Sequence, residues 1–421
     1  MMQIKRQIKD PLYRNSLFWM ANAVVTTGLG FIFWVVIARF YTDAEVGLAA
    51  AIISVISLLA LLSKLGLDVA LIRFLPKVDK PVDLINSSFI LSGITALAVA
   101  AIFIAGSDLW SPPLSFIRKN AIFSIAFVLF TLFWTLSQMM DFVFFARRRA
   151  DFALLKNTIY SLLKIPLPIL LVLHFHTFGI VASWGVAIGI ALAISLLLFL
   201  PRVQSRYKPV PRLNLDIIKD IRRYSAGNYF ANLLGAAPAL ILPIMILNVL
   251  GAEQNAYFYV AWIVTLLLFA IPMAVSQSLF VEGSHFEDSL GMNVRRSFRF
   301  IFLLLIPAII LVLLLGKWLL LLFGAAYSLN ASMLLWILAL SSLFLGVNSV
   351  YMTILRVRGR IRELVIIAGF ITLAVLVGSY LITPTTGIIG LGYAWIAAQG
   401  LVSVYVAFAM SSRYIKRRLW A

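Results

Sequence analysis

Residues 15–76 read NSLFWMANAVVTTGLGFIFWVVIARFYTDAEVGLAAAIISVISLLALLSKLGLDVALIRFLP. This stretch contains two long apolar runs, 15–40 and 45–75, which are separated only by a short polar break around Asp43. A helix needs about 20 largely apolar residues to cross the hydrocarbon core of a bilayer. Each run is long enough, so the stretch predicts two consecutive membrane-spanning helices.

The same pattern continues along all 421 residues, of which 62% are hydrophobic and 12% charged. A soluble protein of this size could not bury so much apolar surface, whereas in a bilayer the surplus faces lipid. The first run is too long for the apolar part of a signal peptide, so we expect it to be retained. We predict an all-α polytopic membrane protein with about twelve transmembrane helices, at residues 15–40, 45–75, 83–106, 116–146, 151–173, 177–201, 221–250, 254–281, 295–322, 328–356, 361–383 and 386–412.

Basic residues lie in the short connections between the apolar runs, and their distribution predicts the orientation. One side of the membrane would hold 29 Lys and Arg and the other side 4, with Lys156 and Lys164 inside a predicted helix. Short cytoplasmic loops carry an excess of Lys and Arg. We therefore expect a protein of the cell inner membrane with cytoplasmic N- and C-termini. The net charge of +19 is spread over these loops rather than gathered on one domain, so we predict no nucleic-acid partner.

The chain divides into two similar halves. The basic, proline-containing linker 202–220 separates an N-terminal lobe, 1–201, from a C-terminal lobe, 221–421. A shift of 209 residues superposes Ser88-Phe89 on Ser297-Phe298, and Arg147 and Arg149 on Arg356 and Arg358. A two-residue insertion before the last helix then aligns Gly179 with Gly390 and Trp184 with Trp395. Because six is an even number of helices, both lobes enter the membrane in the same direction, as in transporters built from parallel repeats.

Composition also excludes several kinds of chemistry. The chain contains no cysteine, which excludes disulfides, thiolate metal sites and cysteine nucleophiles. His174 and His176 form at most a two-ligand pair, so we predict no metal site. The chain has no Walker-type glycine loop and hence no expected ATP hydrolysis. We predict no cofactor.

Lys164 is the clearest candidate for a functional residue. It lies 13 residues past Asp151, which places it about 20 Å into a core of about 30 Å. Pro166 and Pro168 follow, and we expect the helix to kink there because proline lacks an amide donor. Ionisable groups at such depth are costly and often functional. Lys164 either lines a central cavity and attracts an anionic substrate, or reaches the outer interface or a neighbouring partner.

Other charged residues are candidates for gating or coupling. Lys64 and Asp68 are four residues apart and share a helical face, with Arg73 one turn further on. They would form either a polar patch at the inner mouth of the cavity or an interfacial salt bridge. In the repeat, Arg73 aligns with Glu282, and the two would be either a latch between the lobes or two solvated helix ends.

The remaining candidates are more ambiguous. Asp141 would be either a proton-titrating site or, more simply, a partner of Arg147 or Arg148. Arg39 would act at an outer gate or substrate headgroup, or would only cap a helix end. Uncharged polar residues within the spans would form hydrogen bonds between helices or line the cavity. These residues are Asn22, Gln138, Asn228, Asn232, Gln277, Asn348 and Gln399.

The opening stretch also resembles a known family. The pieces Ala38-Arg39-Phe40-Tyr41, Glu45-Val46-Gly47, and Gly66-Leu67-Asp68 through Phe74-Leu75-Pro76 are similar to polysaccharide-biosynthesis flippases. These flippases belong to the multidrug/oligosaccharidyl-lipid/polysaccharide exporter (MOP) superfamily. The six-plus-six layout extends the resemblance over the whole chain.

The resemblance implies a function, which we state as an expectation. It implies two lobes around a V-shaped central cavity and translocation of isoprenoid-pyrophosphate-linked oligosaccharides by alternating access, for surface polysaccharide biosynthesis. Its partners would be the lipid-linked oligosaccharide, membrane lipids, and glycosyltransferases or a polymerase of the same pathway. Lys164 would contact the anionic headgroup or acidic sugars.

Two alternatives remain open. One is a cation-coupled multidrug exporter of the same superfamily, although the first helix carries Asn22 where such exporters often carry an aspartate. The other is a membrane polysaccharide polymerase or ligase. Such an enzyme needs a reactive outer loop, which this chain lacks, so we predict that it is not an enzyme.

Overall fold

The computed structural model describes residues 11–205, 207–210, 213–285 and 290–411. Within these residues the protein is helical, with no strands. Twelve of its helical segments are long and apolar enough to cross a membrane. The prediction of a polytopic all-α membrane protein is confirmed.

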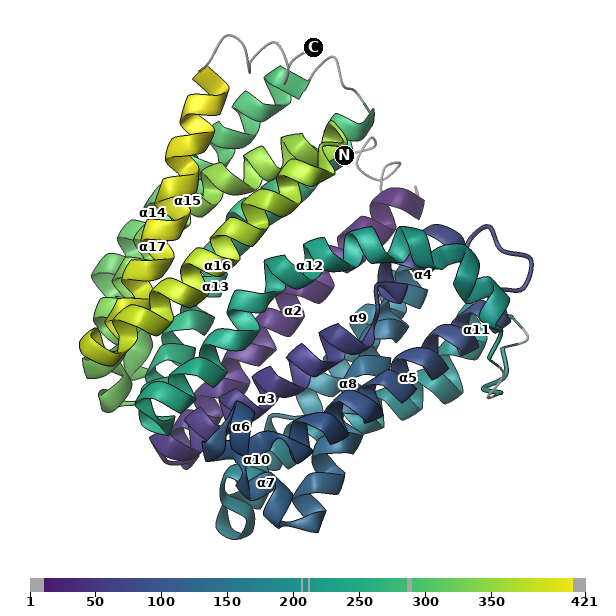
Figure 1. Ribbon diagram of the computed structural model, residues 1–421, viewed down its shortest axis with the longest axis horizontal. Coiled ribbons are helices and arrows are strands. Elements are labelled where there is room, and N and C mark those ends of the chain that lie inside the picture. The colour runs from purple at the N-terminus through teal and green to yellow at the C-terminus, as the bar shows by residue number, and fades with distance from the viewer. Residues whose placement is uncertain (1–10, 206, 211–212, 286–289, 412–421) are drawn as a thin grey trace, which may run out of the picture. The chain divides into compact units, whose positions relative to one another are not determined.

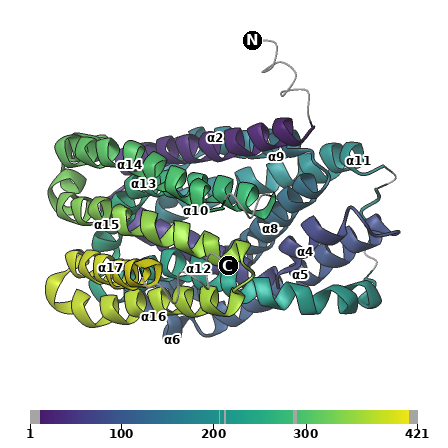
Figure 2. The same ribbon diagram turned by 90° about the horizontal axis from the view of Figure 1, so that it is seen from above.

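The chain forms two compact units, Met1–Leu233 and Leu234–Ala421, and both consist of long helices (Figures 1 and 2). The boundary between them falls inside a helix, and the predicted lobe limits at 202–220 stay a prediction, as does the V-shaped cavity. The first unit contains α2 (Pro11–Phe40), α3 (Asp43–Ser63), α4 (Leu67–Phe74), α5 (Pro81–Ala105), α6 (Ser107–Trp110), η1 (Pro112–Leu114), α7 (Phe116–Lys119), α8 (Ala121–Ala146), α9 (Ala150–Leu163), α10 (Pro166–Ile194), η2 (Ser195–Phe199) and α11 (Leu200–Val203).

The helix α12 (Leu215–Leu250) begins in the first unit and ends in the second. The rest of the second unit comprises α13 (Ala252–His285), α14 (Leu290–Leu321), α15 (Ala325–Val357), α16 (Ile361–Thr386) and α17 (Ile388–Ser411).

Polar residues between the apolar runs set where the helices start. Thr42 accepts a hydrogen bond from the backbone N–H of Glu45, and Glu45 accepts one from the N–H of Thr42, which is a capping box at the start of α3. Asn120 caps α8 by accepting from the N–H of Ile122 at 2.9 Å. Prolines open α5 and α10, where their missing amide hydrogen costs nothing.

Both units pack their helices in the same order. In the first unit, α3 and α8 contact each other and both contact α5 and α10. In the second unit, α13 and α15 contact each other and both contact α14 and α17. The helix α2 packs on α9, and α12 likewise reaches α16. The contacts among α3, α5, α8 and α10 therefore have counterparts among α13, α14, α15 and α17, which confirms the repeat of six plus six helices.

One turn reveals the true register of this repeat. Arg148 and Gly359 both adopt a left-handed conformation, with φ of 55° and 65°. The flanking hydrogen bonds are also equivalent, because Arg149 N–H donates to Phe144 and Arg360 N–H donates to Leu355, both at 2.8 Å. These matches correspond to a shift of 211 residues rather than 209. The two-residue insertion thus precedes this turn instead of the last helix.

The next turn repeats with the same shift but with different residues. His176 kinks α10 with φ 44° and ψ −136°, and its counterpart Gly387 has φ 66° and ψ −156°. Only glycine adopts this region easily, and another residue there is strained by about 1–3 kcal/mol. The His176 ring also contacts the Glu45 carboxylate, with Nδ1 and Oε1 2.9 Å apart.

The second predicted helix is interrupted. Its run was expected to be continuous over 45–75, but α3 ends at Ser63 and α4 begins at Leu67. Leu65 and Gly66 between them are both left-handed, with φ of 51° and 75°. Gly66 makes this break possible because it lacks a Cβ atom. The counterpart helix α13 continues unbroken through the equivalent residues.

A proline interrupts the backbone bonding of α12 near the boundary between the units. Pro238 has no amide hydrogen, so the carbonyl of Leu234 one turn earlier lacks its helical donor. The hydroxyl of Thr372 in α16 donates to that carbonyl at 2.6 Å. Inside a membrane this replacement is needed, because lipid offers no hydrogen bonds.

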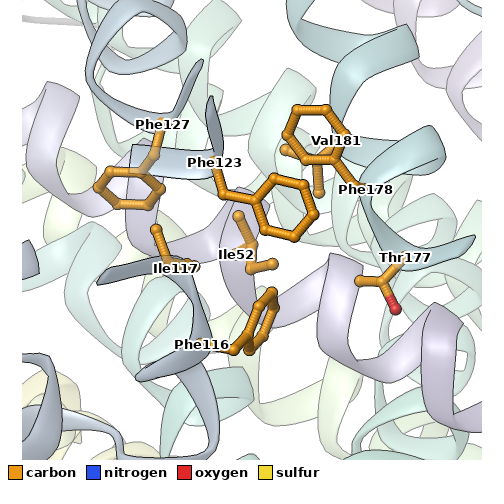
Figure 3. Close-up of a pocket in the computed structure, with 8 residues that line it drawn as sticks. All are labelled: Ile52, Phe116, Ile117, Phe123, Phe127, Thr177, Phe178 and Val181. Atoms are coloured by element: carbon orange, nitrogen blue, oxygen red, sulfur yellow. The ribbon is translucent and has the colours of Figure 1, made fainter. Parts of the chain in front are cut away.

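The first unit also contains an apolar pocket at the N-terminal end of α8. The Arg147–Arg149 turn follows the other end of this helix. It is lined by residues of α3, α7, α8 and α10 (Figure 3). The lining residues are Ile52, Phe116, Ile117, Phe123, Phe127, Thr177, Phe178 and Val181.

Candidate functional site

All the buried charged side chains of the described residues lie in the first unit. They are Lys64, Asp68, Lys156 and Lys164. Charges are costly in a low-dielectric interior unless they are paired or serve a function. The candidate functional residues are therefore concentrated in the first unit.

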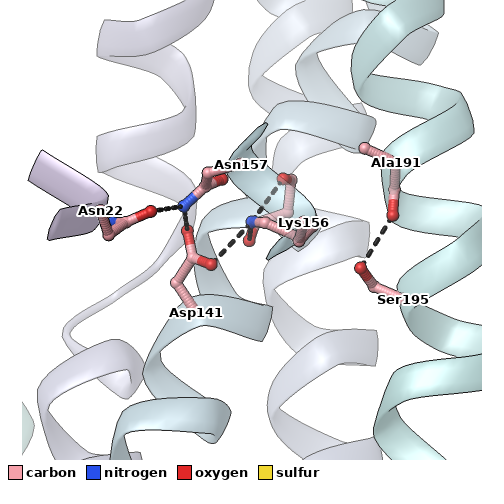
Figure 4. A network of polar contacts seen from close by, with 7 residues as sticks. Asn22, Asp141, Lys156, Asn157, Ala191 and Ser195 are labelled. Carbon is pink, nitrogen blue, oxygen red and sulfur yellow. Dashed lines mark hydrogen bonds and ion pairs between the residues drawn. The ribbon is translucent and has the colours of Figure 1, made fainter. Parts of the chain in front are cut away.

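Lys156 and Asp141 form the centre of a polar network (Figure 4). The side chain of Lys156 is 1% exposed, and its ammonium lies 2.8 Å from Asp141 Oδ1. It also donates to the Ser137 carbonyl at 2.6 Å and to the Ser137 hydroxyl at 2.9 Å. These contacts join α9 to α8.

Two asparagines extend the network to the first helix. The Asn157 amide donates to Asp141 Oδ2 at 3.3 Å and to Asn22 Oδ1 at 2.9 Å. Through Asn157, the network thus joins side chains of α2, α8 and α9 (Figure 4). Because the Lys156 and Asp141 charges cancel, this network offers no net charge to a ligand.

A second ion pair lies at the interruption between α3 and α4. Lys64 Nζ is 3.0 Å from Asp68 Oδ2, and it lies 5.5 Å from the centre of the Phe142 ring. Its positive charge also acts on Asp141. The hydroxyl of Tyr229 in α12 donates to the Leu62 carbonyl at 3.2 Å, beside the break. Negative and positive side chains therefore alternate in the order Asp68, Lys64, Asp141 and Lys156.

Lys164 differs from the other two buried lysines. It is 6% exposed and forms no ion pair with any residue that the structure describes. Its ammonium lies over the rings of Tyr160 and Phe33, at 4.5 and 5.0 Å from their centres. It also donates to the Tyr160 hydroxyl at 3.4 Å.

Local structure explains how Lys164 reaches this place. The helix α9 ends at Leu163 and α10 begins at Pro166, so Lys164 lies at an interruption, as the two prolines predicted. The facing residue on α2 is Gly30, and a Cβ added there would lie 4.0 Å from the ammonium. Aromatic faces attract a cation but do not neutralise it. This ammonium can therefore hold an anion.

The other predicted site residues lie outside these clusters. Gln138 is half-buried, while Asn232, Arg73 and Glu282 are exposed. Arg73 stacks over the Phe74 ring at 5.7 Å from its centre. The side chain of Asn228 lies outside the described residues. Their functional roles, including the latch of Arg73 and Glu282, stay predictions.

Arg39 is exposed on the last turn of α2, next to a tightly held tyrosine. The hydroxyl of Tyr41 donates to the Pro168 carbonyl at 2.7 Å. Burial, together with the nearby Glu45 carboxylate, raises the pKa of Tyr41 to about 12. Tyr41 is thus a neutral donor that joins the end of α2 to the start of α10.

The prediction that Asp141 pairs with Arg147 or Arg148 is wrong, because the structure pairs it with Lys156. Lys156 itself was missed as a site residue. Asp141 lies seven residues before Arg148 and Lys156 eight residues after it. In two antiparallel helices, residues at equal distance from the connecting turn lie at the same depth. This nearly equal spacing from the turn could have identified Lys156 as the partner of Asp141.

The second unit has a polar cluster of a different kind. The Asn348 amide donates to Gln399 Oε1 at 2.7 Å and to the Gln399 carbonyl at 2.9 Å. The Ser403 hydroxyl donates to Asn348 Oδ1 at 2.9 Å. These uncharged groups satisfy one another and join α15 to α17. No group of three His, Asp or Glu suited to a metal ion occurs in the described part of the chain.

Comparison with known proteins gives a family match and a fold. A family model described as polysaccharide biosynthesis protein matches residues 12–237. No curated protein matches the chain. The structure is similar to the lipid II flippase MurJ in an inward closed conformation, with a TM-score of 0.75 and 14% identity over 94% of this chain and 87% of that one.

Two further solved structures are similar. One is a MOP superfamily transporter from Pyrococcus furiosus, with a TM-score of 0.67 and 16% identity over 97% of this chain and 95% of that one. The other is an inward-facing multidrug resistance MATE family transporter, with a TM-score of 0.65 and 16% identity over 96% and 94% of the two chains. At these identities the likeness shows the fold.

Proposed function

The chain belongs to the polysaccharide biosynthesis protein family and has the fold of the MOP-superfamily transporters, and from that premise we propose that it moves isoprenoid-pyrophosphate-linked oligosaccharides across the membrane by alternating access. It would act as a flippase rather than as an enzyme. The charge distribution supports an inner-membrane location with cytoplasmic termini, because 29 basic residues would lie on one side and 4 on the other.

Lys164 carries this proposal. It is the one buried cation without a carboxylate partner among the described residues, and it lies at a break between two helices. An ammonium in a desolvated place favours an anion such as a pyrophosphate or an acidic sugar. The same charge repels the cationic compounds that a cation-coupled drug exporter would carry.

The paired charges support a role in coupling. Lys64, Asp68 and Asp141 lie where α3 is interrupted, and broken helices in transporters mark the parts that move or bind ions. We propose that a change of partner among these charges accompanies the change between inward and outward states. Arg39, Arg73, Asn22, Gln138, Asn232 and Glu282 remain proposed contributors to binding or gating, as does Asn228.

The direct test is a flipping measurement in reconstituted vesicles. A fluorescent polyprenyl-pyrophosphate oligosaccharide is placed in both leaflets, and a membrane-impermeant quencher reports how fast the inner pool reaches the outside. Lys164→Met should slow this rate by about tenfold to hundredfold, since a hydrogen bond to a charged group contributes about 1.5–3 kcal/mol. Lys164→Arg should retain most of the rate because it keeps the charge.

Lys317 offers a matched control. It is an exposed lysine of the second unit that also lies over an aromatic ring, 5.6 Å from the centre of Trp336. Lys317→Met should leave the flipping rate unchanged. A Lys164→Met protein that flips at the normal rate would remove Lys164 from the substrate path. Transport of cationic drugs without transport of the lipid-linked sugar would support the drug-exporter alternative.

A further inference from the structure

A glycine of α2 lies directly beside the Lys164 ammonium. A Cβ atom added to Gly30 would be 4.0 Å from Lys164 Nζ, and it would meet no other neighbouring side chain or helix of the described residues within 4 Å. Gly30 is itself only half-buried. The space next to this buried charge is therefore not filled by the protein around Gly30.

Neither of the usual structural reasons explains a glycine at this position. Gly30 does not have a positive φ, and no backbone approaches it closely enough to exclude a methyl group. A glycine inside a helix is less stable than an alanine, because it loses more conformational freedom on folding. Alanine would therefore fit and stabilise α2, whereas glycine leaves the ammonium uncovered.

The ammonium also has hydrogen bonds left for a ligand. Lysine has three N–H donors, and the described residues accept one from Lys164, at the Tyr160 hydroxyl 3.4 Å away. The rings of Tyr160 and Phe33 lie against the ammonium on two sides. On the side of Gly30 it faces only helix backbone. An anion that approaches along α2 can therefore accept the remaining hydrogen bonds.

We propose that Gly30 is a specificity-determining residue of the Lys164 site, because its missing side chain leaves the opening through which the anionic group of the substrate reaches the ammonium. The proposal rests on the proposed function for the identity of that group, a pyrophosphate or an acidic sugar. It adds that α2 sets how large a group can reach the charge. A larger side chain at position 30 would cover the ammonium without removing it.

The absence of cysteine from the chain permits a first test that needs no transport. A single cysteine is introduced as Gly30→Cys, and the full-length protein is placed in phosphatidylcholine vesicles. Labelling by an anionic and by a cationic methanethiosulfonate, both water-soluble, is timed and compared with the rates for a free thiol. The neighbouring ammonium should favour the anionic reagent by about tenfold or more, and inorganic pyrophosphate should slow it.

Removal of the lysine is the control for this labelling. In the double variant Gly30→Cys/Lys164→Met, the preference for the anionic reagent should disappear. If the preference persists, Lys164 is not the charge beside the opening and the proposal is overturned. It is also overturned if neither reagent labels Gly30→Cys, because an anion in water then has no access to this place.

The flipping measurement tests the size of the opening. Gly30→Leu should slow flipping by about tenfold to hundredfold, as Lys164→Met does, because a covered ammonium cannot donate to the substrate. Gly30→Ala should slow it less. Thermal unfolding should occur at no lower temperature in either variant, because both residues favour a helix more than glycine does. Normal flipping by Gly30→Leu would overturn the proposal.

Gly28 provides a matched control on the same helix. A Cβ atom there would meet nothing within 4 Å, and two residues along a helix turn the side chain by about 200°, away from Lys164. Gly28→Leu should therefore flip the substrate at the normal rate. A loss as large as that of Gly30→Leu would show that the glycines serve the flexibility of α2, and would overturn the proposal.

Two substrates identify the anion. A loss by Gly30→Leu with a neutral oligosaccharide on the polyprenyl pyrophosphate assigns the anion to the pyrophosphate, and a loss only with an acidic oligosaccharide assigns it to the sugar. Either result upholds the opening. Charge-selective labelling in a protein that flips neither substrate would uphold the opening and refute the flippase. Flipping without charge-selective labelling would refute only the opening.

Discussion

In the first unit, α3, α4, α9 and the turn that follows α9 bury three lysines and an aspartate, whereas the described helices of the second unit bury only uncharged polar side chains. Both units nevertheless pack their helices in the same order. The shared architecture therefore forms without the charges. Since buried charges are costly and the second unit folds without them, we propose that the charges of the first unit serve its function rather than its fold.

The largest expected effect breaks the charged network of the first unit. Lys156→Met should destabilise the protein by about 3–5 kcal/mol, because it leaves the Asp141 carboxylate without its cation. The double variant Asp141→Leu/Lys156→Met should recover most of that loss, since an apolar pair replaces both charges. Thermal unfolding of the purified protein measures both.

The same double variant distinguishes a structural role of the Asp141–Lys156 pair from a role in coupling. If the pair serves coupling, the double variant should flip lipid-linked sugar in vesicles far more slowly than the wild type, even though its stability is close to normal. Normal flipping by this variant would show that the pair only joins α8 to α9. The contrast between the two units would then lose its functional meaning.

A smaller effect is expected from the uncharged cluster of the second unit. Asn348→Ala should cost about 1–3 kcal/mol of stability, because Gln399 and Ser403 lose a buried hydrogen-bond partner. The flipping rate per folded molecule should stay unchanged, since this cluster supplies no charge. A strong loss of flipping at normal stability would show that the second unit also contributes polar function.

The smallest effect concerns the turn at His176, whose counterpart in the second unit is Gly387. His176→Gly should stabilise the protein by about 1 kcal/mol, because relief of about 1–3 kcal/mol of backbone strain outweighs the flexibility of glycine and an exposed contact with Glu45. The reciprocal change Gly387→Ala should destabilise by a similar amount. Denaturation midpoints compare the two variants.

If His176→Gly instead destabilises the protein, the contact with Glu45 is worth more than the strain. The histidine would then be a specific link at that end of the first unit. Glu45→Gln, which weakens the contact but leaves the backbone unchanged, separates these two contributions.

Much of the fold was predictable from the sequence. Twelve apolar runs predicted twelve spans, because a bilayer imposes length and composition on each helix. Prolines after Lys164 predicted the interruption between α9 and α10. The repeat was detectable from a few matched residues, but its register was off by two at the Arg147–Arg149 turn, because repeated arginines fit two alignments and only backbone conformation distinguishes them.

The site was less predictable. The break at Leu65 and Gly66 was missed because the apolar run continues through it without a proline. Asp141 was assigned to the arginines nearest in sequence, whereas its partner Lys156 lies across the helical hairpin. Which of several cations a carboxylate meets depends on helix rotation, and a span that is apolar on most sides carries little information about rotation.

The helix α12 has a mechanical consequence. It is a single continuous helix whose residues belong to both units, so its hydrogen-bonded backbone links one unit to the other. Two prolines, Pro238 and Pro243, interrupt its hydrogen bonds, and at the first of them Thr372 supplies the donor for the Leu234 carbonyl. The stretch of α12 from Pro238 to Pro243 should therefore bend more easily than the rest of the helix, and Pro238→Ala should stiffen it without touching a charged group.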